Sequence, residues 1–370
     1  MLDTELLVRC TTVLPGHRAR RPAETFAAMA DWCETHGIAH DVYGEGALIQ
    51  DFERKVAARL GVEAALFCIS GTMAQVTALR LAANDRGRAP VALHPTSHIF
   101  VHEGSNFQLL GHFDALQVGD RHRPWSAADI TSIPERLAAV GIEIPMREIG
   151  GQSTSWDDLQ ALKAHCRERD IHLHMDGARL WEAAAGYGRD VAEIAAGFDS
   201  VYVSLYKGIG GLGGAMLCGS AAFVARAARW FARQGGKLVH QSPYVAAAAM
   251  QFDARLAAMP ACFARTEFVY EVVRGHPQLK LNPARPQASM LHVHLPVSRE
   301  RALEIRREIA QVHGTWIFHR VNHGVLPDSC YFELYVGDNL VDAPDHRVRE
   351  AFALLAAAVA PAGLDGQAHP

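Results

Sequence analysis

The chain has 370 residues, of which 49% are hydrophobic and 21% charged, and its formal net charge is −4. This length and apolar content predict a soluble globular protein of about two domains. Acidic and basic residues are interspersed, which excludes the strongly basic surface typical of proteins that bind nucleic acid or anionic membranes, so we expect neither partner.

The cysteines indicate a reducing compartment. There are seven, an odd number, and none forms a C-x-x-C pair, which argues against a disulfide framework. The N-terminal segment lacks the apolar stretch of a secretory signal, and no window approaches the roughly 20 apolar residues of a membrane span. We therefore expect a cytoplasmic protein.

The histidines do not form a recognisable metal motif. Of the 20 histidines, His94 with His98 and His172 with His174 have spacings that two ligands could use. Neither pair lies in an H-E-x-x-H context, and the alternating HLHM segment suits a strand. We predict no bound metal.

Strands and helices alternate through the first two thirds of the chain. An apolar run at 62–69 precedes a helical pattern at 70–83 and a short apolar run at 91–94, and a helix at 157–170 precedes a strand at 171–175. Two further apolar runs, 200–206 and 213–219, flank a stretch of glycines. This order predicts an α/β domain with a mostly parallel sheet flanked by helices.

The pattern changes after about residue 245. An alanine-rich helical region leads to strands at 289–297 and 330–338, with a helix between them and another at 351–360. We predict a large domain with an N-terminal arm over 1–245 and a smaller α+β domain over 246–370. The last segment, 363–370, is predicted to be a disordered tail.

The glycine stretch SLYKGIGGLGG (204–214) has two competing interpretations. Gly208, Gly210 and Gly213 satisfy G-x-G-x-x-G, which would suit a nicotinamide-dependent oxidoreductase. That motif requires a following helix and an acidic residue about 20 positions on, whereas here an apolar strand follows and residues 226–237 contain no acid. The glycines are better explained by close approach of the backbone to other elements, which leaves Lys207 as the candidate for the residue that carries the chemistry.

A lysine that forms a Schiff base with pyridoxal 5′-phosphate needs three kinds of partner, and the sequence offers a candidate for each. Asp176 ends a strand and could face the pyridine nitrogen, while Ser70, Gly71 and Thr72 precede a helix whose amino end could hold the phosphate. His98 could stack on the ring, and Ser204 could add a hydroxyl to the phosphate. Each residue also has an ordinary interpretation: a helix N-cap, a turn, a polar side chain or a surface lysine.

Five segments in this order resemble the threonine aldolase and β-eliminating lyase family of pyridoxal-phosphate enzymes. The resemblance implies fold type I, with a seven-stranded sheet in the large domain. It also implies a homotetramer, a dimer of dimers in which two subunits complete each active site near the DVYG segment. The segments are HDVYGEG (40–46), SGTMAQ (70–75), SHIFVHEG (97–104), HMDGARLWEA (174–183) and SLYKGIGG (204–211).

The resemblance assigns a role to each matching residue. Lys207 would carry the cofactor, Asp176 would pair with the pyridine nitrogen, and His98 would stack on the ring. Gly71 and Thr72 would hold the phosphate, and Arg179 would lie beside the cofactor or the substrate carboxylate.

The segments that would face the substrate depart from the family pattern. Cys10 stands where the family's R-S-D-T has serine, EIPMREIGGQ (143–152) replaces E-N-T-H, and CYFELYVGD (330–338) lacks the expected arginine. We take Arg179, Arg147 and Cys10 as substrate-binding candidates and His102 as the residue near the β-hydroxyl. Weaker candidates around the pocket are Arg233, Lys237, His240, Arg320, Trp181, Phe100 and Tyr206.

These observations predict a low-specificity L-threonine aldolase-like lyase, which cleaves L-β-hydroxy-α-amino acids to glycine and an aldehyde. A β-eliminating lyase acting on another amino acid is the close alternative. A nicotinamide-dependent oxidoreductase is the alternative of a different class.

Overall fold

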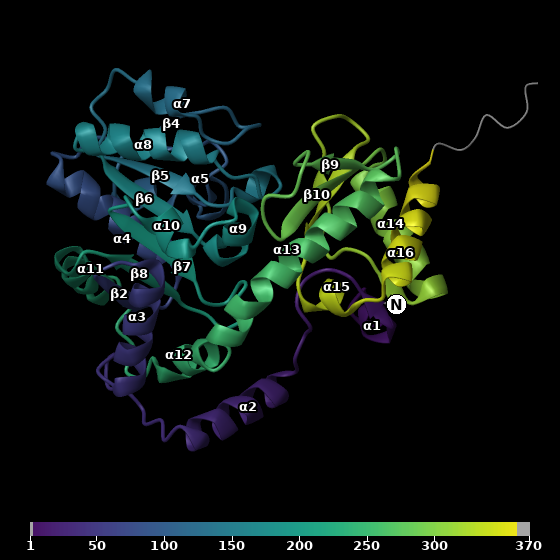
Figure 1. Ribbon diagram of the computed structural model, residues 1–370, viewed down its shortest axis with the longest axis horizontal. Coiled ribbons are helices and arrows are strands. Elements are labelled where there is room, and N and C mark those ends of the chain that lie inside the picture. Colours follow the sequence, from purple (N-terminus) through teal and green to yellow (C-terminus); the bar gives the residue numbers. More distant parts are fainter. Residues whose placement is uncertain (1–2, 361–370) are drawn as a thin grey trace, which may run out of the picture. The chain divides into compact units, whose positions relative to one another are not determined.

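The computed structural model describes residues 3–360 of the chain (Figure 1). Its contacts divide the chain into two compact units, Arg20–Met259 and Met1–Ala19 with Pro260–Pro370. The domain boundary predicted at 245/246 stays a prediction, because it refers to domains that fold independently and not to units defined by contacts. The predicted tail at 363–370 lies outside the described residues.

The larger unit is built on a seven-stranded sheet with the order β2-β8-β7-β6-β5-β3-β4. Strands β4, β3, β5, β6 and β7 pair in parallel, whereas β8 runs antiparallel to both β7 and β2. The predicted mostly parallel sheet is therefore confirmed. The strands are β2 (Ala64–Cys68), β3 (Val91–Leu93), β4 (Ala115–Gln117), β5 (Ala139–Glu143), β6 (His172–Gly177), β7 (Ser200–Ser204) and β8 (Ala215–Gly219).

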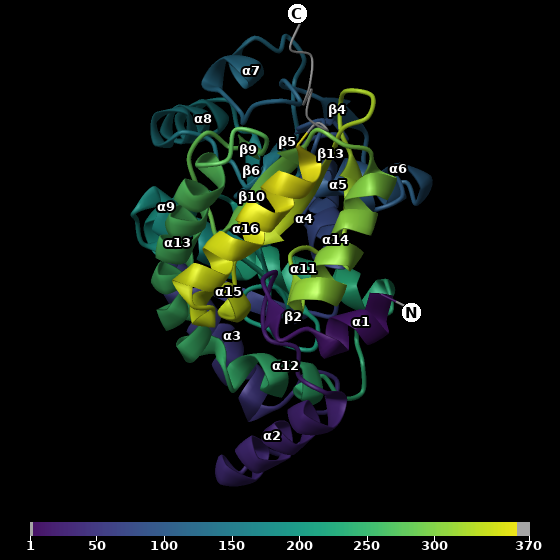
Figure 2. The same ribbon diagram turned by 90° about the vertical axis from the view of Figure 1, so that its right-hand side faces the viewer.

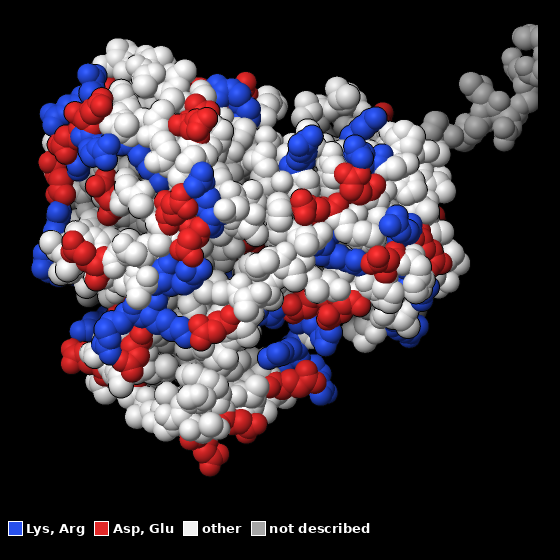
Figure 3. Space-filling view, in the orientation of Figure 1, with Lys and Arg blue, Asp and Glu red and all other residues white. Residues whose placement is uncertain are grey.

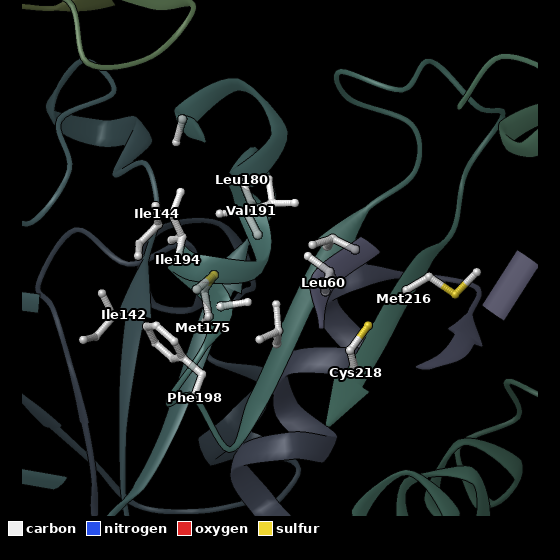
Figure 4. Close-up of a cluster of buried hydrophobic side chains, with 14 of the residues drawn as sticks. Leu60, Ile142, Ile144, Met175, Leu180, Val191, Ile194, Phe198, Met216 and Cys218 are labelled. Atoms are coloured by element: carbon white, nitrogen blue, oxygen red, sulfur yellow. The ribbon is translucent and has the colours of Figure 1, made fainter. Parts of the chain in front are cut away.

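Helices cover both faces of this sheet because its central strands are apolar on both sides. Every residue of β5, β6 and β7 is buried. Val201 and Val203 belong to the core beneath α3, α8 and α10, part of which Figure 4 shows, while Tyr202 packs with the core of α4 and α11. The helices of this unit are α2 (Pro22–Thr35), α3 (Ala47–Leu60), α4 (Gly71–Asp85), α5 (His98–His102), α6 (Asn106–Leu109), α7 (Ala127–Thr131), η1 (Arg147–Ile149), α8 (Trp156–Glu168), α9 (Leu180–Tyr187), α10 (Val191–Ala195), α11 (Ala221–Arg233) and α12 (Ser242–Ala249).

Serine side chains start three of these helices. Ser70, Ser155 and Ser220 each accept a hydrogen bond from the backbone N–H three residues further on, at the beginning of α4, α8 and α11. Such N-caps satisfy donors that the helix leaves unpaired. They fix where each helix begins, and for α4 this point lies directly after strand β2.

The smaller unit contains a four-stranded antiparallel sheet with the order β12-β13-β10-β9. Helices α14 and α16 lie side by side in this unit (Figure 2). The strands predicted at 289–297 and 330–338 and the helices after them are confirmed. The elements are α1 (Asp3–Arg9), β1 (Thr12–Val13), β9 (Lys280–Asn282), β10 (Met290–Leu295), α14 (Arg299–His313), β11 (Thr315–Trp316), β12 (Asn322–His323), β13 (Cys330–Tyr335), α15 (Asp338–Asp342) and α16 (Asp345–Val359); α13 (Phe252–Arg274) continues from one unit into the other.

Surface charge is mixed in sign. On the face shown in Figure 3, basic and acidic side chains lie next to one another over both units. None of the helices in residues 3–360 combines the length and the apolar character that a membrane crossing requires. Within the same residues no group of three or more His, Cys, Asp or Glu side chains could hold a metal ion, and all seven cysteines are free.

Candidate active site

A cavity of about 320 Å³ opens in the larger unit where strands β5, β6 and β7 end and helix α4 begins. Ligands of parallel sheets gather at this carboxyl edge, because the loops there diverge and helix amino ends point toward it. Residues from five segments of the chain meet in the cavity. They include Gly71, His98, Glu143, Asp176, Tyr202 and Lys207.

Lys207 lies in the turn after β7 and lines the cavity. Its backbone N–H donates to Ser204 Oγ over 3.3 Å, and its carbonyl accepts from Gly210 N over 3.1 Å. Burial lowers the pKa of the Lys207 ammonium, and the positive charge of Arg179 lowers it further. A lysine in such a setting loses its proton more readily and becomes a usable nucleophile.

Ser204, the predicted hydroxyl partner of the phosphate, ends strand β7. It is fully buried and is not among the residues that line the cavity. Its Oγ accepts hydrogen bonds from the backbone N–H groups of Tyr206 and Lys207, both over 3.3 Å. The Ser204 side chain therefore shapes the turn that carries Lys207.

Asp176 stands near the end of β6 with 6% of its surface exposed. Its Oδ1 accepts a hydrogen bond from Ala178 N over 3.1 Å, and its neighbours in the sheet are Glu143 on β5 and Tyr202 on β7. Gly177 must be glycine here, since a Cβ atom would come within 2.7 Å of the Tyr202 carbonyl oxygen. The sheet thus holds the Asp176 carboxylate against the cavity.

Glu143 is a lining residue that the sequence interpretation did not single out. Its Oε1 accepts a hydrogen bond from Arg147 N over 3.1 Å, and Oε2 is buried without a hydrogen-bond partner among the described residues. Burial and the negative charge of Asp176 raise the pKa of this carboxyl to about 7. The available signal was an acid at the end of an apolar strand, the same signal that identified Asp176.

The amino end of α4 forms an anion cradle. Ser70, Gly71 and Thr72 all line the cavity, and Ser70 Oγ caps the helix by accepting from Met73 N over 3.2 Å. The first N–H groups of a helix have no acceptor within it and attract phosphate. A Cβ atom on Gly71 would lie 2.2 Å from Tyr202 Oη, so only glycine leaves this cradle open. These residues fit the phosphate of pyridoxal phosphate.

His98 begins α5 and presents a partly exposed ring to the cavity. Its Nδ1 lies 3.0 Å from Oε1 of Glu103, whose side chain is only 1% exposed and whose Oε2 accepts from Asn106 Nδ2 over 3.2 Å. The buried carboxylate fixes the orientation of the imidazole. Glu103 lies in the SHIFVHEG segment (97–104), but its contact with His98 depends on the fold and could not be predicted from the sequence.

His102, Arg147 and Glu148 form an outer cluster that does not line the cavity. His102 Nε2 lies 2.7 Å from Glu148 Oε1 and 3.3 Å from Arg147 Nη1. Arg179 precedes α9, and its charge reaches Lys207, although it is not a lining residue either. Cys10 belongs to the smaller unit, where its thiol donates to the Leu6 carbonyl over 3.3 Å.

The weaker candidates mostly have structural contacts. Trp181 is buried against Phe252, and Phe100 packs on Phe107, whereas Tyr206 lines the cavity. In the remaining set, Arg233 stacks on Trp230, Lys237 lies over Tyr43, His240 Nδ1 is 2.6 Å from the Asp41 carbonyl oxygen, and Arg320 lies in the smaller unit.

The glycine run packs closely and leads into strand β8. A Cβ atom on Gly214 would lie 2.5 Å from Phe67 Cε2, and one on Gly211 would lie 2.7 Å from the Leu205 carbonyl oxygen. Because a strand and not a helix follows, these glycines do not lead into a helix amino end that would bind a pyrophosphate. The nicotinamide interpretation is therefore wrong, and the close-approach interpretation is confirmed.

The chain is similar to known proteins over most of its length. Residues 23–296 match the family model described as beta-eliminating lyase. The chain is 30% identical over 255 residues to the low specificity L-threonine aldolase of Saccharomyces cerevisiae, a match covering 64% of this chain and 62% of that protein. It is 29% identical over 226 residues to the low specificity L-threonine aldolase of Escherichia coli K12, covering 60% and 67%. The chain thus matches less than two thirds of the yeast protein's length.

Solved structures similar to nearly the whole chain include two threonine aldolase relatives. A proposed L-allo-threonine aldolase from Listeria monocytogenes EGD-E superposes with a TM-score of 0.90 at 35% identity, covering 96% of this chain and 98% of that one. A threonine aldolase from Leishmania major superposes with a TM-score of 0.73 at 18% identity, covering 94% and 100%. The second likeness shows the fold alone.

Proposed function

Because this chain belongs to the beta-eliminating lyase family and so takes pyridoxal 5′-phosphate as its cofactor, we propose that it cleaves L-β-hydroxy-α-amino acids to glycine and an aldehyde. The observation that carries this proposal is the meeting of Lys207, Asp176 and the amino end of α4 in one cavity. The threonine aldolases among its relatives support the choice of substrate class.

When bound, the cofactor supplies an electron sink for the charge left at Cα when the Cα–Cβ bond breaks. Lys207 would hold it covalently, and the lowered pKa of Lys207 favours the neutral amine that this bond requires. The carboxylate of Asp176 would keep a proton on the ring nitrogen. Ser70, Gly71 and Thr72 would bind the phosphate at the start of α4.

We assign His98 to the face of the ring and Glu103 to the orientation of His98. Removal of a proton from the substrate β-hydroxyl needs a base within hydrogen-bond reach of that oxygen. Among the predicted candidates, His98 lines the cavity and His102 lies in the outer cluster, with their rings 5.1 Å apart. We therefore favour His98 over His102 as the side chain nearer to the substrate.

For the substrate carboxylate, Arg179 and Arg147 stay the proposed partners. Both are permanently charged and can form bidentate pairs with a carboxylate. The charge of each influences Tyr206, which lines the cavity. Cys10 stays a prediction for this role.

The proposal is tested by the colour and products of the purified protein. We expect a yellow protein whose visible band shifts on addition of glycine and is lost in Lys207→Ala. Incubation with threonine or phenylserine should release glycine and aldehyde in equal amounts. Ammonia and a keto acid without glycine would instead establish the β-eliminating alternative, and a protein that ignores added pyridoxal phosphate would refute the proposal.

We further propose a cytoplasmic homotetramer that contains shared active sites. None of the 14 residues of helix α2 is buried, and it exposes 57% of Phe26; Val42 and Tyr43 of the DVYG segment are also exposed. Exposed apolar side chains of this kind are typical of surfaces that another subunit covers. Light scattering should give the mass of four chains of 40.3 kDa; the mass of one chain would contradict this assembly.

A further inference from the structure

Helices α4 and α11 pack against each other in the larger unit, and arginine side chains cross between them at two places (Figure 1). Arg226 of α11 forms a bidentate ion pair with Asp85 of α4, over 2.8 and 2.5 Å. Arg80 of α4 instead lies over the indole ring of Trp230 on α11, with its guanidinium carbon 3.9 Å from the ring centroid. The first arginine therefore has a negative partner, whereas the second contacts only an aromatic face.

The half-buried guanidinium of Arg80 keeps hydrogen-bond donors that the chain does not use. Its Nη1 donates to His112 Nδ1 over 3.0 Å, whereas Nε is buried without an acceptor among residues 3–360. His112 is 5% exposed, and burial together with the charge of Arg80 lowers the pKa of its imidazole. The ring is therefore neutral, so it supplies an acceptor but no negative charge to Arg80.

Two further arginines add positive charge around Arg80. Arg233 lies over the same indole ring, 4.8 Å from its centroid, and Arg88 follows the end of α4. Burial lowers the pKa of the Arg80 guanidinium, the charges of Arg88 and Arg233 lower it further, and no carboxylate of the described residues opposes them. None of the three arginines forms an ion pair with an acidic side chain within residues 3–360. Like charges this close repel one another, and water screens the repulsion less where a group is partly buried.

The geometry of these side chains suits a phosphate group. Arg88 and Arg233 are exposed, so a ligand can reach them from solvent. A guanidinium that stacks on an aromatic ring keeps its N–H donors at its edge, where they can bond two phosphate oxygens at once. A doubly charged phosphate also balances more than one of the three positive charges, which a bidentate neutral ligand would not do.

We propose that Arg80, Arg88 and Arg233 form a binding site for a phosphate group, either free or carried by a small molecule. This arginine site is separate from the catalytic cavity, since none of its residues lines that cavity. Arg80 is nine residues past Gly71 in α4, which places it about 14 Å further along the helix axis than the cofactor cradle. The inference therefore does not depend on the proposed reaction.

The test measures binding of inorganic phosphate and of glycerol 3-phosphate to the holoenzyme by isothermal titration calorimetry, with the ionic strength held constant by potassium chloride. We expect saturable binding of one ligand per chain. Arg80→Met, which keeps a long side chain over Trp230, should weaken it at least tenfold, and Arg88→Gln about three- to tenfold. Arg121→Met alters an exposed arginine of the loop after β4 and should bind as wild type does.

The two probes distinguish the sources of the phosphate group. Tighter binding of glycerol 3-phosphate would support a phosphorylated metabolite as the ligand, and tighter binding of inorganic phosphate would support the free ion. Binding that is unsaturable, or that Arg80→Met and Arg88→Gln leave unchanged, would mean attraction to dispersed charges or to the cofactor cradle and would overturn the proposal. If Arg80→Met does not fold, the exposed changes Arg88→Gln and Arg233→Gln carry the same comparison. Should the protein fail to take up the cofactor, the proposed function would fail, but the difference between wild type and Arg80→Met would still report on the arginine site.

Discussion

Two groups of polar residues near the cavity differ in how the fold holds them. Glu143, Asp176 and Lys207, the strand-end group, lie at the ends of neighbouring strands, and both carboxyls are 6% exposed. The outer cluster of His102, Arg147 and Glu148 is more exposed, and its members contact one another. Burial perturbs the pKa values of Glu143 and Lys207, and a perturbed group in a cavity is a candidate for chemistry. Sheet register therefore fixes the buried carboxyls of the strand-end group, whereas the outer cluster is held by contacts among its own side chains.

The largest effect should follow removal of charge from the strand-end group. We expect Asp176→Asn to lower kcat for threonine or phenylserine cleavage about 10³-fold, because the ring nitrogen loses its ionic partner. Steady-state assays with cofactor occupancy checked by absorbance measure this effect. Asp199→Asn, at the start of β7, is the matched control; its carboxylate accepts from Leu173 N, and we expect kcat within about twofold of wild type. An Asp176→Asn enzyme that keeps a tenth of wild-type activity would contradict the role given to the strand-end group.

Next in size is the pH dependence of stability. The pKa of Glu53, which accepts from Phe67 N, and that of Glu143 are both raised from 4.5 to about 7. Between these values the unfolded chain releases a proton that the folded protein keeps. The protonated carboxyl therefore stabilises the folded protein fully below pH 4.5. This stabilisation, up to about 3 kcal/mol per group, is lost as the pH rises through 7.

Urea unfolding of the apoprotein at pH 4.5 and pH 8 measures this loss. We expect the free energy of unfolding to fall less over this range in Glu53→Gln and in Glu143→Gln than in wild type. Bound cofactor should change the contribution of Glu143 to the pH dependence of stability and leave that of Glu53 unchanged, because Glu53 does not line the cavity. An unchanged pH profile in Glu53→Gln would show that burial does not hold its proton.

A smaller effect on kcat is expected from Glu103, whose buried carboxylate contacts the partly exposed His98. Glu103→Gln should lower kcat about 10- to 30-fold, the loss expected for one hydrogen bond to a charged group. In His98→Asn the further change Glu103→Gln should add almost nothing, because Glu103 would act only through His98. Asn106→Ala, which removes the other donor to Glu103, is the control and should be nearly neutral. Fully multiplicative effects would refute the positioning role.

The smallest effect on kcat/KM should come from the His102–Glu148 pair of the outer cluster. We expect His102→Ala to change kcat/KM about twofold, because exposed pairs such as His102 with Glu148 contribute little. The assay with threonine serves here too, with Glu148→Gln as the paired variant. A loss of more than tenfold would place His102 at the β-hydroxyl, as the sequence interpretation suggested, and would remove the distinction between the two groups.

Much of the fold and part of the site could be predicted from the sequence because their signals are local. Apolar runs, helical periods and serine N-caps such as Ser70 depend on neighbouring residues, so the strands and helices around the cavity were found in order. An acid or a lysine directly after an apolar run, as at Asp176 and Lys207, carries the same local signal. The order of these segments along the chain then made the family resemblance recognisable.

The tertiary structure decided what depends on register and on approach between distant segments. Burial raises the pKa of Glu143, and the charge of Asp176, which the pairing of β5 with β6 brings beside it, raises it further. Gly71 must be glycine because Tyr202, far along the chain, fills the space. The contact of the buried Ser204 hydroxyl with the Lys207 turn likewise depends on the fold, and its role at the phosphate stays a prediction. Hydrogen bonds and burial depend on contacts between residues that are far apart in the sequence. The types of residue at the site could therefore be predicted from the sequence, whereas the contacts of each residue could be read only from the fold.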